Sequence, residues 1–167
     1  MAEFITELYH QNHHPFSSLE SLAKANRWSF NRLDEDLMLM HIESSWRILS
    51  ITLSVSHIEK TIRLTCSFDL NPREGRELDL YQLINRINQR CAEGAFTIDH
   101  DEGVVVFRNS IMLVERNDLN WKHLNIILNE AVQNCETYYP SFQLVNFGKA
   151  GSNEALDIVI SDIQGNA

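Results

Sequence analysis

The strongest constraint on the fold is a strict alternation of apolar and polar residues in the middle of the chain. Every second residue is apolar within residues 46–55 and again within residues 61–68, and the residues between them are mostly small and polar. Side chains along a strand point alternately to opposite faces, so a period of two predicts antiparallel strands with one buried and one wet face. The residues expected to face inward are Leu49, Ile51, Leu53, Val55, Ile62, Leu64, Cys66 and Phe68.

Further strands are predicted on either side of this alternating region. Trp28 and Phe30 point one way in a strand region that follows the first helix. Residues 37–42 are apolar on both faces, and a short strand carries Phe96 and Ile98. A long apolar strand is expected over residues 104–114, and the segment 99–103 before it ends in glycine and predicts a hairpin turn.

Three helices are predicted. Pro15 opens the first, which ends near Asn26, because the fixed φ of proline suits a first helical turn. Asn71-Pro72 is interpreted as the start of the second, whose apolar stripe runs to Cys91. The third carries its stripe over residues 124–135 and runs into Tyr138-Tyr139-Pro140, after which residues 142–147 form an apolar segment.

The expected fold class is α+β, in the order α-β-β-β-α-β-β-α, with three or four strands before the second helix and the helices packed on one face of an antiparallel sheet. Strands and helices do not alternate strictly, which disfavours a parallel doubly wound sheet. We expect an N-terminal arm over residues 1–14, one domain over residues 15–148, and a polar C-terminal tail over residues 149–167 with a short apolar stretch at 158–160.

Composition narrows the classes of partner. The net charge is −9, and the lysine and arginine residues are scattered singly, so binding to nucleic acid or to anionic membranes is disfavoured. The charge fits a basic protein partner, or it simply keeps the protein soluble. No apolar run approaches the length of a membrane span, and the start lacks the basic region of a secretory signal, so we expect a cytoplasmic location. Cys66, Cys91 and Cys135 are odd in number and far apart, which argues against a disulfide framework or a zinc site.

A search for catalytic patterns finds none. The six glycines form no phosphate-binding loop, and neither GxSxG nor HExxH occurs. The acidic segment 99–102 is interpreted as a solvated hairpin tip rather than a metal loop. His10, His13 and His14 are interpreted as an adventitious metal binder, and His57, His123 and the Cys135-Glu136 pair have no recognisable catalytic partner. We therefore expect no catalytic, cofactor or metal site, and no cofactor, although catalytic groups can assemble from distant positions.

Four aromatic residues have two readings. Trp28, Trp46, Tyr138 and Tyr139 can form a recognition surface, because tryptophan and tyrosine dominate interface hot spots, or they can fill the core. The core reading is the commoner case. The sequence does not identify the residues that bind a partner.

Several segments in order resemble the YbjN family. They are Asn26-Arg27-Trp28-Ser29-Phe30, Cys66-Ser67-Phe68-Asp69, Leu83-Ile84-Asn85-Arg86-Ile87-Asn88, Gly94-Ala95-Phe96, the hairpin residues 102–108, and residues 135–143, whose sequence CETYYPSFQ is the most specific. The resemblance spans about residues 15–148. It implies a bacterial regulator of sensory transduction, a fold like that of the dimeric chaperones of type III secretion effectors, and no catalytic residues.

Two functions from different classes follow. The first is a non-catalytic protein-binding module, chaperone-like or regulatory. The alternative is a regulatory domain that senses a small molecule in a pocket. We also expect a homodimer, since residues 37–42 and 104–106 are apolar on both faces and need cover on both sides, unless residues 158–160 or Phe4, Ile5 and Leu8 fold back over them.

Overall fold

The computed structural model describes residues 15–112 and 121–165. Helix α2 (Pro15–Asn26) comes first and is followed by four strands, β1 (Ser29–Asp34), β2 (Leu37–Glu43), β3 (Ile48–Ser56) and β4 (Thr61–Asp69). Helix α3 (Glu77–Asn88) leads to the hairpin of β5 (Ala95–Asp99) and β6 (Val104–Met112). Helices α4 (Trp121–Asn146) and α5 (Ser152–Gly165) complete the fold.

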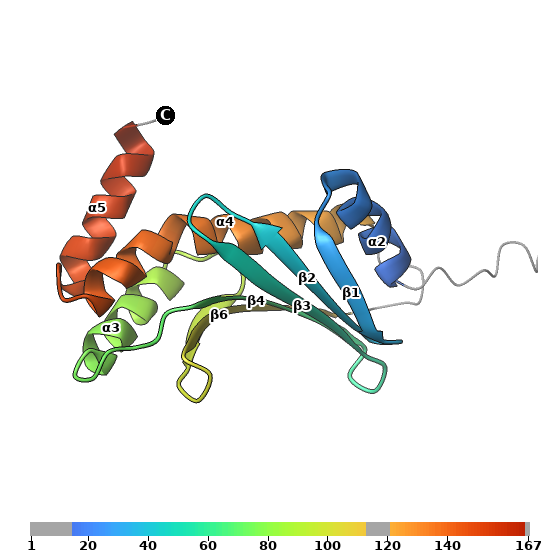
Figure 1. Ribbon diagram of the computed structural model, residues 1–167, viewed down its shortest axis with the longest axis horizontal. Coiled ribbons are helices and arrows are strands. Elements are labelled where there is room, and N and C mark those ends of the chain that lie inside the picture. The colour runs from blue at the N-terminus through green and yellow to red at the C-terminus, as the bar shows by residue number, and fades with distance from the viewer. Residues whose placement is uncertain (1–14, 113–120, 166–167) are drawn as a thin grey trace, which may run out of the picture.

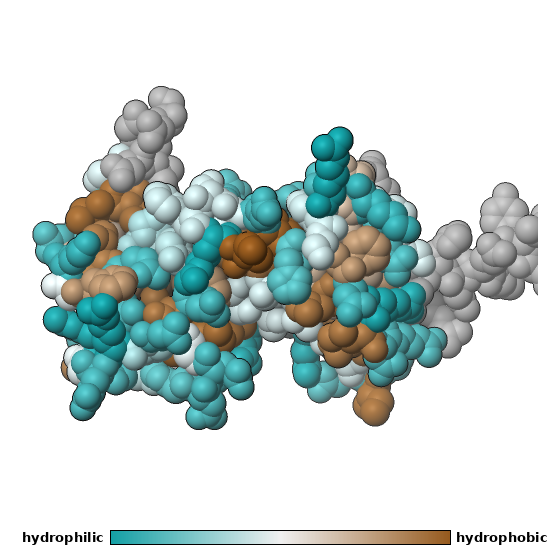
Figure 2. All heavy atoms as spheres, in the orientation of Figure 1, coloured by the Kyte–Doolittle hydropathy of each residue, from teal (hydrophilic) through white to brown (hydrophobic). Residues whose placement is uncertain are grey.

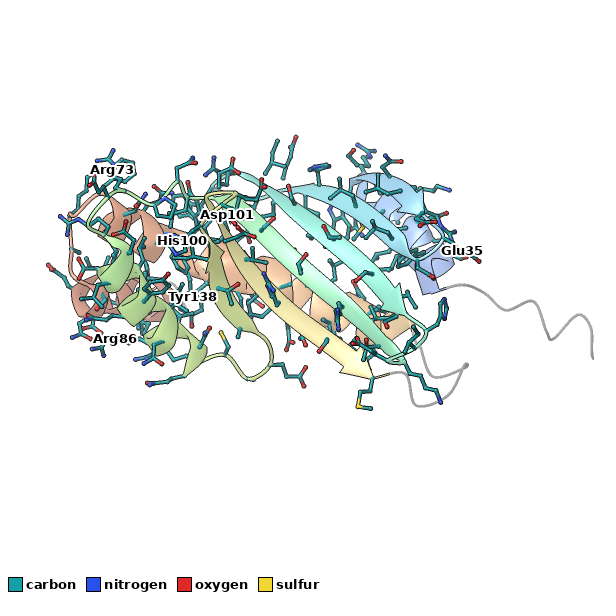
Figure 3. All side chains as sticks on the ribbon, turned by 90° about the horizontal axis from the view of Figure 1, so that it is seen from below. Glu35, Arg73, Arg86, His100, Asp101 and Tyr138 are labelled. Atoms are coloured by element: carbon teal, nitrogen blue, oxygen red, sulfur yellow. The ribbon has the colours of Figure 1, made fainter. Side chains whose placement is uncertain are left out.

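One antiparallel sheet of six strands, in the order β1-β2-β3-β4-β6-β5, organises the molecule. Helix α4 lies along one face of this sheet, with α2 at the β1 end and α3 and α5 at the opposite end (Figure 1). Seen from below, the strands lie in front of α4, and none of the described helices covers this second face (Figure 3). The expected α+β class, with an antiparallel sheet and helices on one face, is therefore confirmed.

The alternating residues divide between these two faces as predicted. The inward set of β3 and β4 is buried, and it forms one core with Phe107 of β6 and with Leu128 and Phe142 of α4. On the other face, cross-strand pairs such as Thr52 with Thr65 are only half-buried. Because the helices cover only one face of the sheet, the polar side chains on the other face can bond to water and need no partner within the protein.

The structure differs from the expected order α-β-β-β-α-β-β-α in two places. Four strands precede the second helix, the larger of the two expected numbers, because β1 is a separate edge strand that pairs with β2. Segment 149–167 is not a polar tail: it contains α5, whose Ala155 and Leu156 lie in the core and whose Val159 is buried. Apolar residues at positions i, i+1 and i+4 make a narrow helical stripe, which the surrounding polar residues obscure in the sequence.

Helix α3 begins at Glu77, so the prediction that Asn71-Pro72 starts it is wrong. The segment before α3 is instead held by Asn146 at the end of α4. The Asn146 amide donates to the carbonyls of Leu70 (3.1 Å) and Asn71 (3.3 Å) and accepts from the Arg73 N–H (2.9 Å). Asn71 has a left-handed φ of 50°, and its N–H donates to the Gly103 carbonyl (2.8 Å). Long-range hydrogen bonds therefore outweigh the local helix signal.

Pro140 lies inside α4, which continues over 26 residues to Asn146. The sequence had predicted that the helical stripe ends before this proline. A proline removes its own N–H from the helical hydrogen-bond pattern, and that loss is offset here because Phe142 and Val145 beyond it are fully buried. Residues 1–14 and the end of the predicted strand at residues 113 and 114 lie outside the described part of the chain.

Candidate binding surfaces

The turn between β2 and β3 presents a large aromatic side chain to solvent. Trp46 is 57% exposed, yet its ring stacks on that of Tyr139 in α4, with centroids 6.3 Å apart and planes 21° apart. The Arg47 guanidinium lies 5.7 Å from the centroid of the same tyrosine ring and also pairs with Asp69 (3.6 Å). We call the set Ser45, Trp46, Arg47, Glu136 and Tyr139 the Trp46 surface.

Hydrogen bonds fix this turn to the helix. The Glu136 carboxylate accepts from the Ser45 N–H (2.8 Å) and from the Ser45 hydroxyl (3.2 Å). Within the turn, the Ser44 N–H donates to the Arg47 carbonyl (3.0 Å). The indole is therefore presented on a tethered turn, and a partner that binds it loses little conformational entropy in ordering it.

A groove of about 450 Å³ lies beside this turn. Ile48, two residues after Trp46, forms one side of it, and Figure 2 shows hydrophobic side chains at the surface where β2 and β3 approach their turn. The groove, which we call the Arg27 groove, is lined by Asn26, Arg27, Trp28, Ser29, His41, Glu43 and Ile48.

The end of α2 positions Arg27 in this groove. The Trp28 N–H donates to the Ala23 carbonyl (2.9 Å) and the Arg27 N–H to the Lys24 carbonyl (3.2 Å). Many helices end with this pair of hydrogen bonds. The first residue after such a helix has a left-handed backbone conformation and is usually glycine. Arg27 occupies that position with a φ of 58°.

The chain belongs to the YbjN family. The model of that family, described as "Putative bacterial sensory transduction regulator", matches residues 15–144. The match includes the residues of the Arg27 groove and of the Trp46 surface. The YbjN resemblance inferred from the sequence motifs is thus confirmed.

Three solved structures are similar to this chain at low sequence identity, and the first of them shows the same fold. The crystal structure of the ExsC–ExsE complex matches with a TM-score of 0.54 and 15% identity, covering 73% of this chain and 88% of that chain. The crystal structure of YbjN from E. coli, described as a putative transcription regulator, matches with a TM-score of 0.47 and 12% identity over 77% and 85% of the two chains. The HopA1–SchA chaperone–effector complex matches at 0.49 and 16% over 73% and 90%. Among curated protein sequences, no match is found.

The four aromatic residues of this YbjN-family chain divide between the two readings. Tyr138 is buried, Trp28 and Tyr139 are half-buried and pack against the core, and Trp46 is exposed. The preference for the core therefore fails for Trp46. Its position in a turn is the signal that could have identified it, because a side chain in a short turn between two strands lies at the end of the sheet rather than beneath it.

The structure gives two of the candidate polar residues different surroundings. His57 has a carboxylate neighbour after all, since its Nε2 lies 2.9 Å from Asp36 Oδ1 across two turns. His123 is exposed at the start of α4. The acidic segment 99–102 forms the β5–β6 turn, as predicted, and the Nε2 of His100 within it lies 2.5 Å from the Tyr81 hydroxyl of α3. Figure 3 shows His100 and Asp101 near α3.

The part of the chain that the structure describes contains no group of three or more histidine, cysteine, aspartate or glutamate side chains able to hold a metal. His10, His13 and His14 lie outside that part. Over the same residues, no helix has both the length and the apolar character needed to cross a bilayer.

Two of the cysteines meet in the core although they are far apart in the sequence. The Cys135 thiol lies 3.8 Å from the Cys66 carbonyl and donates to it. A hydrogen bond with the Cys66 side chain, together with burial, raises the pKa of Cys135 far above its usual range, and burial also raises the pKa of Cys91. All three thiols are free. Thiols with raised pKa values are poor nucleophiles, so Cys135 and Cys91 are packing residues.

Proposed function

We propose that this protein is a protein-binding module without a reaction of its own, and that the Trp46 surface receives the partner. The observation that carries the proposal is that Trp46 is 57% exposed while it is stacked on Tyr139 and tethered through Ser45 to Glu136. Tryptophan and arginine are enriched among the residues that dominate binding energy. An ordered indole beside Arg47 therefore has the character of an interface anchor.

The fold and the charge support this proposal. A chain of the same fold is found in the ExsC–ExsE complex, which contains a second protein. The YbjN family is described as a regulator of sensory transduction, a role that recognition of another protein can fulfil. With a net charge of −9, the chain attracts basic proteins and repels nucleic acid. A cytoplasmic location stays a prediction from the sequence.

Affinity purification from the native cell, followed by mass spectrometry, tests the proposal. A protein recovered with the wild-type chain is then purified, and its Kd is measured for wild type, Trp46→Ala and Ile58→Ala. Ile58 is a suitable control because it is 97% exposed in a turn of the same sheet. We expect Trp46→Ala to weaken binding and Ile58→Ala to leave it unchanged. Equal affinities for all three proteins would remove the Trp46 surface from the proposal.

The alternative is a small-molecule sensor, and the Arg27 groove is the observation that favours it. Its volume of about 450 Å³ lies within the usual range of ligand pockets. Most such pockets are lined by apolar groups and enclose their ligand, whereas Arg27, Ser29, His41 and Glu43 are all exposed here. Thermal melting with a panel of metabolites tests this alternative, since saturation at about 100 times the Kd adds about 2.7 kcal/mol to stability.

Homodimerisation stays a prediction, now limited to particular residues. Leu37 and Leu39 of β2 point to the face of the sheet that no described helix covers and are half-buried, and Leu33 of the neighbouring strand is exposed. This row of leucines is where we propose a second copy to pack. Sedimentation equilibrium of the full chain should give a dimer that Leu39→Asp dissociates, and a monomer of the wild type would contradict it.

A further inference from the structure

The position of Arg27 is one that glycine normally occupies. Its φ of 58° lies in the left-handed region, where a side chain crowds the backbone. Residues held in such conformations are enriched at functional sites, although Lys60 and Asn71 also adopt the left-handed region in this chain, so the groove around Arg27 has to supply the further evidence. The structure thus places a long cationic side chain where the helix end itself requires none.

The charged groups of the Arg27 groove have no partners among the described residues. Four of the other arginines form ion pairs within the described residues: Arg32 with Glu20, Arg47 with Asp69, Arg63 with Glu59 and Arg76 with Asp79. By contrast, the side chains of Arg27, His41 and Glu43 make neither an ion pair nor a hydrogen bond within residues 15–112 and 121–165. A cation and an anion that share one groove therefore both remain available to a bound molecule.

The apolar side of the groove makes a covering partner the natural occupant. Ile48 is 57% exposed, and it adjoins Trp46 along the β2–β3 turn. A protein segment that covers Ile48 also removes water from Arg27 and Glu43. A charged side chain that loses its water without gaining an opposite charge strongly opposes binding. A matching partner must therefore supply both a negative and a positive side chain.

We propose that the Arg27 groove binds a segment of the partner protein that places an acidic side chain against Arg27 and a basic side chain against Glu43. This inference rests on the proposed protein-binding function and specifies its partner. Arginine binds a carboxylate through two parallel hydrogen bonds, which gives direction as well as affinity. The net charge of −9 favours a partner of basic character, so we assign the segment to a different, basic protein.

Selection from a phage-displayed library of random peptides tests the proposal. The library is selected in parallel on the full-length wild type, on Arg27→Gly and on the charge-swapped variant R27E/E43R. The matched control is R63E/E59R, which reverses an exposed ion pair near the opposite end of the sheet. Glycine suits the backbone at position 27, so Arg27→Gly removes the charge without disturbing the fold, and circular dichroism verifies that each variant is folded.

We expect wild type and R63E/E59R to select the same peptides, each with an acidic and a basic residue near an apolar one. Arg27→Gly should bind these peptides at least about tenfold more weakly, because a hydrogen bond to a charged group is lost. R27E/E43R should select peptides in which the acidic and basic positions are exchanged.

Identical peptides on wild type and R27E/E43R would overturn the proposal, and so would a library from which the wild type selects nothing. A Trp46→Ala variant separates the proposed protein-binding function from the proposed charge recognition by the Arg27 groove. If it loses the peptides while R27E/E43R keeps them, the protein-binding function stands and the charge-reading groove falls. If neither variant changes binding, both fall. A wild-type dimer in sedimentation that R27E alone dissociates would show that a second copy occupies the groove, which also overturns the proposal.

Discussion

The turns at the two ends of β3 present different kinds of exposed apolar residue. At the first end, Trp46 is 57% exposed but stacked on Tyr139, flanked by Arg47 and tethered to Glu136. At the other end, Ile58 is 97% exposed and lies between the polar residues His57 and Glu59 at the tip of the β3–β4 turn. Among the described residues, only the first turn is tied to a helix. The proposed binding surface thus combines exposure with a fixed orientation, whereas Ile58 has exposure alone.

The largest effect is expected on the free energy of unfolding, from a substitution in the core beneath the sheet that carries both turns. Phe107 is fully buried, lies opposite Cys66 in the sheet and packs edge-on against Phe96 with ring centroids 5.0 Å apart. Phe107→Ala should lower the free energy of unfolding by about 3–5 kcal/mol, because it leaves a cavity beneath α4. Urea denaturation measures this loss. A change near zero would mean that β6 does not face the core.

The second prediction separates the two turns. Trp46→Ala should reduce the free energy of partner binding by about 2 kcal/mol or more, as expected for a tryptophan hot spot. Its cost to folding should be only about 1 kcal/mol, since the indole is more than half exposed and loses a single ring stack. Ile58→Ala should change neither quantity. Calorimetry of binding and thermal melting measure the two effects, and a hot spot at Ile58 would reverse the comparison.

A third prediction concerns the stability of the protein at alkaline pH. It depends on Cys135, which precedes Glu136, the residue that holds the turn carrying Trp46. Hydrogen bonding with Cys66 and burial hold the pKa of Cys135 above its unfolded value. The folded state then binds more protons than the unfolded state, so stability is full below the ordinary thiol pKa and falls as pH rises above it. The slope for one such group is about 1.4 kcal/mol per pH unit. Cys135→Ala should make the curve of stability against pH shallower, whereas replacement of the half-exposed Cys91 should do so less.

The smallest effect should be a gain in stability. Arg27→Gly relieves the left-handed strain at the end of α2, and this relief is partly cancelled by the greater freedom of glycine in the unfolded chain. We expect a gain of up to about 1 kcal/mol by urea denaturation. A clear loss would show that the Arg27 side chain contributes to the fold, and it would contradict the proposal that this side chain serves binding.

Local periodicity was enough to predict the sheet. Leu49 to Phe68 alternate because β3 and β4 have one buried face, and that pattern is present in the chain itself. The signals that failed were overridden by contacts between distant residues. Asn71-Pro72 has the composition of a helix start, but the Asn146 amide, 75 residues away, holds this segment in another conformation.

The two candidate binding surfaces depend on contacts between distant residues in the same way. The turn position of Trp46 could have indicated its exposure, but its stack on Tyr139 depends on how α4 lies across the end of the β2–β3 hairpin. The Arg27 groove likewise brings together the end of α2 and three different strands. The motifs nevertheless identified the family, because the segment at residues 26–30 includes Arg27 and Trp28 and the segment at residues 135–143 includes Tyr139.

The position of α4 in the chain has a consequence for biosynthesis. This helix packs on the apolar face of the central strands β4 and β6, yet it begins only at Trp121, after the six strands of the sheet have been made. During synthesis the strands leave the ribosome before α4 is made, so the apolar face of the sheet is exposed to the cell for that time. Exposed apolar surface of this kind aggregates or binds chaperones. Chains that stop before Trp121 are therefore expected to be insoluble or degraded, whereas chains that reach Asn146 gain both the cover and the amide that holds the segment before α3.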